Sequence, residues 1–212
     1  MPNGLLYDNP GADEWMDSRM EMFRETKKSV LSQEGDFDWI ISVDFRTPKK
    51  YLDEIADDDR ITYAYCDIRS VFRYWVADTP WVITTRLDCD DQLKPGFVKR
   101  VQDHFEPKLR VLDVRFEELE WHTKRIHEGE RRWAGSMFLS LIEPSDKIQT
   151  AFCRPHGEVA GGYPIEGSWD EGWGAKTIIE YYIIEETLAY MVCHGKNIAN
   201  IIRGKYLRTL NK

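Results

Sequence analysis

Apolar strand-like segments alternate with helix-like segments between residues 39 and 87, and this pattern limits the possible folds more than any other feature. The strand-like segments are rich in β-branched and aromatic residues. The predicted strands are residues 39–43, 61–65 and 81–87, and the predicted helices between them are residues 48–56 and 68–77. Such alternation indicates an α/β protein with a mainly parallel sheet and right-handed crossover connections.

The rest of the chain is expected to surround this unit without repeats or linkers. Met16, Met20 and Phe23 recur at helical spacing, so a helix is expected to begin near Asp13. The further predicted elements are a helix over 95–105, strands over 109–116, 137–143 and 150–153, a hairpin or excursion over 117–134, a long loop over 154–175 and a helix over 176–193. The 212 residues suit a single domain.

A group of carboxylates directly follows the third predicted strand. Asp88, Asp90 and Asp91 lie within four residues of one another. Carboxylates at the end of a buried strand are costly unless a positive charge meets them. Closely spaced oxygen ligands suit Mn²⁺ or Mg²⁺, which complete their coordination with phosphate oxygens and water. Acid-rich turns are also common as plain solvated loops, so the pattern alone leaves both interpretations open.

The position of these residues favours a binding site. In open parallel sheets, ligands bind outside the carboxyl ends of the strands. Asp44, Asp67 and Asp88 each follow a predicted strand, so all three are expected at one rim of the sheet.

Composition excludes several classes of protein. The chain has 29 basic and 37 acidic residues, which argues against general nucleic-acid binding. The four cysteines are widely spaced, so a zinc site or disulfide framework is not expected. Such cysteines instead suit a reducing, cytoplasmic environment. No apolar run approaches the roughly 20 residues that span a bilayer, so no integral membrane segment is expected.

Three sequence segments carry a resemblance to a known family. "DFDWIISVDFRTP", "ITTRLDCDD" and "HGKNIANIIRG" resemble the rhamnosyltransferases of bacteria and viruses, which are glycosyltransferases of the GT-A fold. The resemblance covers most of residues 15–205. It implies one GT-A domain over 1–212, with a nucleotide-sugar half over about 1–94 and an acceptor-side half over about 95–212. The chain could also correspond to the N-terminal part of a larger viral capsid-glycosylating enzyme.

The resemblance also implies roles for individual residues. Asp44 would contact the base or ribose, and Asp88 would lie near the ribose and help to hold the metal. Asp90 would be the direct metal ligand, and Asp91 a second ligand or a donor-sugar contact. His194 stands where many GT-A enzymes have a late metal-binding histidine. A helix-terminal histidine bonded to the backbone is the alternative for His194.

Further candidates come from the residue types. Arginine pairs well with phosphate oxygens, so Arg69 and Arg86 are expected to hold a diphosphate, with surface ion pairs as the alternative. Lys196 and Asn197 follow His194 and could close on the same diphosphate. Two carboxylates in the long loop, Asp170 and Glu171, lie between tryptophans and could deprotonate an acceptor hydroxyl.

These expectations describe a metal-dependent glycosyltransferase. The donor would be a nucleoside-diphosphate sugar, UDP-linked, with rhamnose suggested by the resemblance and glucose possible. The acceptor would be a hydroxyl of a glycan or glycoprotein. A non-catalytic nucleotide- or carbohydrate-binding module is the alternative. A sugar nucleotidyltransferase fits less well, because residues 1–15 lack the Gly-rich loop such an enzyme needs.

Overall fold

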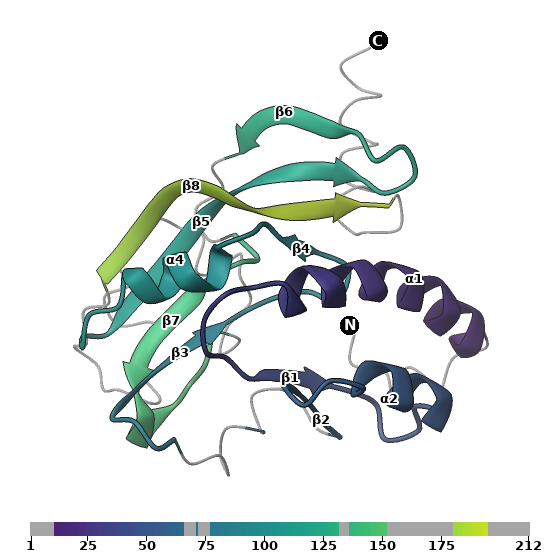
Figure 1. The fold of residues 1–212 in the computed structure, drawn as a ribbon, viewed down its shortest axis with the longest axis horizontal. Coiled ribbons are helices and arrows are strands. Elements are labelled where there is room, and N and C mark those ends of the chain that lie inside the picture. The colour runs from purple at the N-terminus through teal and green to yellow at the C-terminus, as the bar shows by residue number, and fades with distance from the viewer. Residues whose placement is uncertain (1–10, 66–70, 72–76, 132–135, 152–179, 195–212) are drawn as a thin grey trace.

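The computed structural model describes residues 11–65, 71, 77–131, 136–151 and 180–194. Figure 1 shows how the elements are arranged. In chain order they are α1 (Ala12–Leu31), β1 (Trp39–Ser42), α2 (Lys49–Ile55), β2 (Ile61–Ala64), β3 (Trp81–Thr85), β4 (Gln92–Leu93), α4 (Phe97–Asp103), β5 (Arg110–Glu120), β6 (Ile126–Arg131), β7 (Ser140–Pro144), a 3₁₀ turn (Ser145–Lys147) and β8 (Glu180–Cys193). The predicted mixture of helices and strands is confirmed.

The described strands form two sheets. β1 and β2 make a two-stranded parallel sheet, and the larger sheet has the order β3-β7-β5-β8-β4, with β6 paired to β5. β3 runs antiparallel to β7, whereas the two longest strands, β5 and β8, run parallel. The expectation of one mainly parallel sheet through residues 39–87 therefore differs from the structure, because β3 belongs to the larger sheet.

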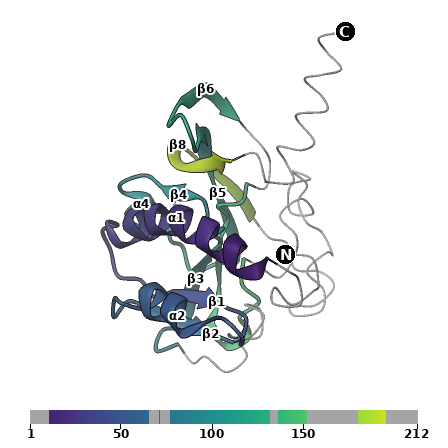
Figure 2. The same cartoon turned by 90° about the vertical axis from the view of Figure 1, so that its right-hand side faces the viewer.

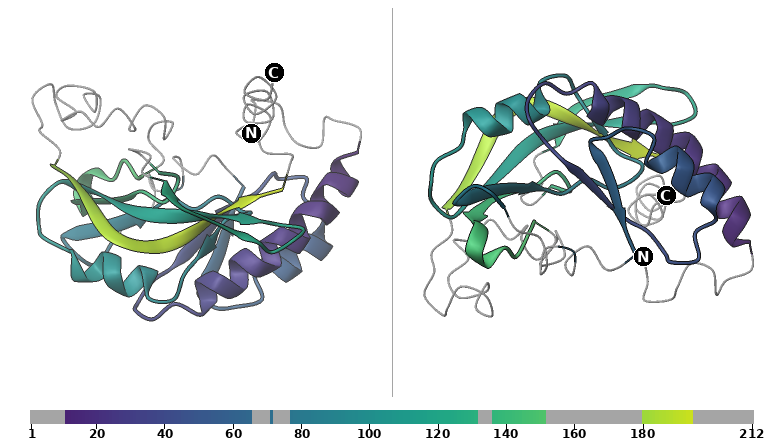
Figure 3. Two further views of the ribbon diagram at one scale, coloured as in Figure 1. Left: turned by 90° about the horizontal axis from the view of Figure 1, so that it is seen from above. Right: turned by 60° about the horizontal axis from the view of Figure 1, so that its bottom comes forward.

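Helix α1 lies between the two sheets and packs against both (Figures 1 and 2). Met16, Met20 and Phe23 of α1 contribute to a core with α2 and β2. Val30 at its far end joins the main core, which α4 and the strands β5 and β8 also build. Seen from above, α1 and α4 cover the same side of the larger sheet (Figure 3). The predicted helix from Asp13 is confirmed by α1.

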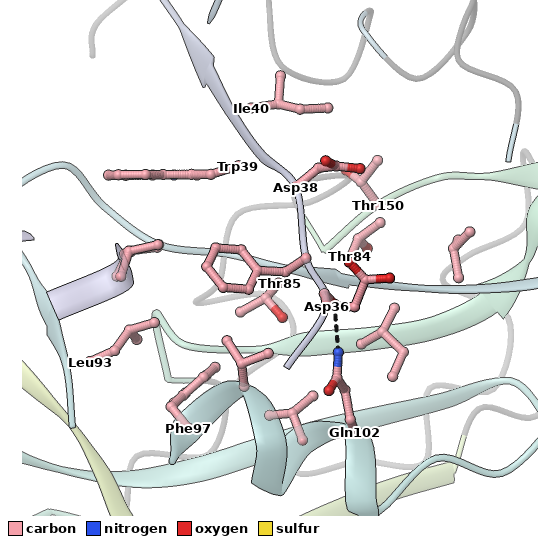
Figure 4. Close-up of a pocket in the computed structure, with 17 residues that line it drawn as sticks. Asp36, Asp38, Trp39, Ile40, Thr84, Thr85, Leu93, Phe97, Gln102 and Thr150 are labelled. Atoms are coloured by element: carbon pink, nitrogen blue, oxygen red, sulfur yellow. Dashed lines mark hydrogen bonds between the residues drawn. The ribbon is translucent and has the colours of Figure 1, made fainter. Parts of the chain in front are cut away.

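Edges of β1 and β3 line a common cavity of about 250 Å³ (Figure 4). The N–H groups of Trp39 and Val43 bond to the β2 side, so the alternate residue Ile40 directs its backbone groups away from β2. Arg86 N–H bonds to Leu139 O, in register with the β3–β7 ladder, so Ile83 directs its backbone groups away from β7. No described strand pairs with either of these edges.

The predicted helix over 176–193 is wrong for its described part, because residues 180–193 form strand β8. The pairing of β8 with β5 shifts register twice: Val114 is opposite Ile184, but Arg115 is opposite Thr187. Such bulges change which residues of a strand face the core. The buried positions consequently include Ile184, Leu188 and Met191, whose spacing imitates one face of a helix.

A second correction concerns residues 150–153. Thr150 has a φ of 71° and Ala151 lies in a turn, so the described part of this predicted strand is not extended. The reason is local: the Thr150 N–H donates to the buried carboxylate of Glu143, which fixes the turn after β7. Over residues 117–131, the described part of the predicted hairpin, the prediction is confirmed by the end of β5 and by β6.

Among the residues that the structure describes, no helix combines the length and the apolar character needed to cross a bilayer.

Candidate functional site

Helix α1 holds the segment that contains the predicted acidic site from one side. Its side chains contact this segment at successive turns. Thr26 Oγ1 lies 3.2 Å from Cys89 O, and Ser29 Oγ accepts the Leu93 N–H. Gln33 Nε2 donates to Lys94 O at the end of the same segment. These bonds fix the backbone on both sides of Asp90.

Strand β8 holds the segment from the other side. Gln92 pairs with Tyr190 and Leu93 with Ala189 in an antiparallel ladder. The Oδ1 atom of Asp91 accepts the Val192 N–H at 2.8 Å, and Asp91 is only 2% exposed. Burial raises the pKa of the Asp91 carboxyl well above its usual range, and the neighbouring carboxylates act in the same direction. Asp91 therefore ties the acidic segment to the end of β8.

This double attachment brings Asp90 and His194 together from positions 104 residues apart. His194 Nε2 lies 2.8 Å from Asp90 Oδ2. The two side chains are largely buried, at 3% and 13% exposure. Burial lowers the pKa of His194, although the hydrogen bond to Asp90 opposes this shift, so the neutral ring is favoured. The expected convergence of these two residues is found, although a strand rather than a helix delivers His194.

The third member of the site is Arg19, which the sequence analysis did not single out. Its Nη1 atom lies 2.5 Å from Asp90 Oδ2 and 3.0 Å from His194 Nε2. The guanidinium is the positive charge that the acidic segment needs. A signal was present in the sequence: Arg19 lies three residues after Met16 and four before Phe23, on the apolar face of α1, where a charge requires a partner.

Asp88 and Arg86 lie beside this cluster. Arg86 Nη2 donates to Asp88 Oδ1 at 3.4 Å, and the Asp88 side chain remains 41% exposed. The alternative role foreseen for Arg86, an ion pair with a neighbouring acid, is therefore present. Asp44 lies in the turn after β1, where Arg46 binds it through the backbone N–H and the guanidinium. The remaining predicted site residues lie outside the described residues: Asp67, Arg69, Asp170, Glu171, Lys196 and Asn197.

The donor atoms of the cluster suit a divalent ion in part. Ligands bound at about 2.1 Å and at right angles stand about 3 Å apart, close to the separation of Asp90 Oδ2 and His194 Nε2. Carboxylate oxygen with imidazole nitrogen is also a fair donor set for Mn²⁺. No group of three or more His, Cys, Asp or Glu among the described residues is arranged to hold a metal.

Comparison with protein-family models, with curated proteins and with solved structures found no match.

Proposed function

We propose that this protein is a metal-dependent glycosyltransferase that transfers a sugar from a nucleoside-diphosphate sugar to a hydroxyl of a glycan or glycoprotein. The observation that carries the proposal is the pairing of Asp90 with His194 at 2.8 Å, next to the end of a buried strand. The family resemblance implies that both residues bind one ion, and they come from distant parts of the chain. A UDP-linked donor, with rhamnose as its sugar, is the form of the proposal that the family resemblance supports.

The roles of the residues follow from their contacts. Asp90 and His194 would hold Mn²⁺ or Mg²⁺ through Oδ2 and Nε2. The ion would stabilise the negative charge that develops on the departing diphosphate. Asp91 positions Asp90, because its carboxylate is fixed to the Val192 N–H. Arg86 keeps Asp88 in place and offers its guanidinium to a phosphate oxygen.

The remaining roles are proposals from the sequence. Asp44 would contact the base or ribose from the turn after β1. Asp67, Arg69, Lys196 and Asn197 would add donor contacts. Asp170 or Glu171 would accept the proton of the acceptor hydroxyl.

A GT-A-like core is part of the same proposal. It requires β1 and β3 to belong to one sheet. The backbone groups of Ile40 point away from β2, and those of Ile83 point away from β7. Both strands line the same cavity, which supports this arrangement. One further strand in that place would join the two sheets.

The proposal is tested by a screen of nucleoside-diphosphate sugars, with and without Mn²⁺, by thermal shift. A ligand that binds the folded state raises the melting temperature by mass action. The true donor class is expected to do so only with Mn²⁺ and then to be hydrolysed slowly. Tight binding without turnover, with or without glycan acceptors, would instead identify a binding module. No stabilisation by any nucleotide with Mn²⁺ would contradict the proposed function.

A further inference from the structure

One guanidinium nitrogen lies against both candidate metal ligands. Arg19 Nη1 is 2.5 Å from Asp90 Oδ2 and 3.0 Å from His194 Nε2, while these two atoms are 2.8 Å apart. The three atoms form a triangle contributed by α1, the segment after β3 and the end of β8. The Arg19 side chain is only 17% exposed. Arg19 is thus built into the site from an element that is otherwise remote in sequence.

The hydrogen atoms of this triangle limit what each group can do. If His194 Nε2 accepts the Arg19 N–H, its lone pair is directed at Nη1, and no hydrogen lies between Nε2 and Asp90 Oδ2 at 2.8 Å. Two acceptors this close are then held together only by the cation beside both. If Nε2 instead carries a hydrogen and donates it to Asp90, that N–H faces the guanidinium N–H. In the first arrangement the Arg19 nitrogen occupies the place of a cation shared by Asp90 and His194.

Arg19 makes one further contact in the same position. Its guanidinium carbon is 5.2 Å from the centre of the Trp15 ring, one helical turn earlier on α1. An aromatic face attracts a guanidinium, and the arginine side chain is long and flexible. The Trp15 ring therefore supports the guanidinium from the side of α1 while the Nη1 atom contacts Asp90 and His194.

We propose that Arg19 is an exchangeable cation that occupies the metal position until a divalent ion and a diphosphate enter together. This inference rests on the proposed metal site. An ion alone must displace Arg19 and then stand close to its positive charge. A diphosphate removes this penalty, because its oxygens can contact the ion and the guanidinium at once. Metal and diphosphate consequently bind with positive coupling, each raising the affinity for the other by the same factor.

The test measures Mn²⁺ binding by electron paramagnetic resonance of the free ion, with and without UDP. Arg19→Met is compared with Arg24→Met, which removes the same charge from the same helix. Arg24 is a suitable control because it is more exposed and pairs with Glu54. Arg19→Met is expected to bind Mn²⁺ alone about tenfold more tightly than the control. The factor by which UDP raises Mn²⁺ affinity is expected to shrink in Arg19→Met alone.

Two other variants keep the test decisive. Arg19→Lys retains a positive charge and is expected to bind Mn²⁺ alone with intermediate affinity, so a folding defect of Arg19→Met does not decide the result. The proposal is overturned if Arg19→Met, or Arg19→Lys where only that variant folds, binds Mn²⁺ no more tightly than Arg24→Met. Asp90→Asn separates the two levels of inference. If it leaves Mn²⁺ binding unchanged, the metal site and the exchange both fall. If Asp90→Asn abolishes Mn²⁺ binding but the wild-type protein turns over no donor, the metal site stands and only the proposed function fails.

Discussion

At the scale of single residues, Asp90 is the most exacting test of the site. It contacts Arg19 and His194, and its side chain is 13% exposed. We expect Asp90→Asn to reduce Mn²⁺-dependent UDP binding by at least tenfold, because an amide oxygen is a weaker ligand than a carboxylate. Calorimetry is the measurement, and Asp103→Asn is the control, since it removes an exposed carboxylate elsewhere. Equal losses in the two variants would contradict the assignment of Asp90.

A second residue, Glu143, is expected to make stability depend on pH. Glu143 is fully buried, and burial raises the pKa of its carboxyl to about 7, although the N–H groups of Gln149 and Thr150 oppose the shift. Above pH 4.5 the unfolded chain releases this proton while the folded protein keeps it. The free energy of unfolding should therefore fall as the pH rises towards 7, by up to about 3 kcal/mol.

The measurement for Glu143 compares wild type with Glu143→Gln in denaturant at pH 5 and pH 8. Gln cannot ionise, so wild type should lose stability relative to the variant between these two values. The variant has its own constant penalty of about 1–3 kcal/mol, because both Glu143 oxygens accept backbone N–H groups and an amide –NH₂ cannot. A gain of wild type relative to the variant with rising pH would show that these donors outweigh burial.

At the scale of elements, strand β8 shows what the sequence could and could not predict. The ends of the strands were predictable, because apolar runs end at polar residues. The convergence of Asp90 with His194 was expected from the family resemblance. The identity of β8 was not predictable, since its bulges place buried residues at helical spacing. Its pairing with β5, far away in sequence, outweighs the local pattern. The pairing of β3 with β7 could not be predicted either, because alternating strands and helices indicate parallel neighbours and not an antiparallel partner from later in the chain.

Helix α1 is expected to control the site through a single buried hydroxyl. Thr26 is 0% exposed, and its hydroxyl lies 3.2 Å from Cys89 O, next to Asp90. Thr26→Val keeps the shape but leaves that carbonyl without this donor, at a cost of about 1 kcal/mol. We expect Mn²⁺ affinity to fall several-fold together with stability. Ser18→Ala is the matched control, because its hydroxyl bonds within α1. Unchanged Mn²⁺ affinity in Thr26→Val would show that the Thr26 hydroxyl does not position Asp90.

At the scale of the whole molecule, the two sheets are expected to unfold together. Trp39 packs against both the main core and the core between α1 and β2, so it links the sheets across their gap. Met20 belongs to one of these cores and Phe97 to the other, and both are buried. Because α1 and Trp39 take part in both cores, loss of either core removes support from the other, and a single transition results.

The corresponding experiment follows thermal unfolding by near- and far-ultraviolet circular dichroism. Met20→Ala and Phe97→Ala should each lower the midpoint temperature of one common transition. The expected losses of unfolding free energy are about 2–5 kcal/mol for Met20→Ala and about 3–5 kcal/mol for Phe97→Ala. Trp39→Ala should broaden the transition, because the side chain shared by the cores is lost while α1 still joins them. Two transitions in the wild type would mean that the β1–β2 sheet folds independently. The site would then depend on the larger sheet and α1 alone. Arg19 lies on α1, Asp90 lies between β3 and β4, and His194 directly follows β8. The strands β3, β4 and β8 belong to the larger sheet.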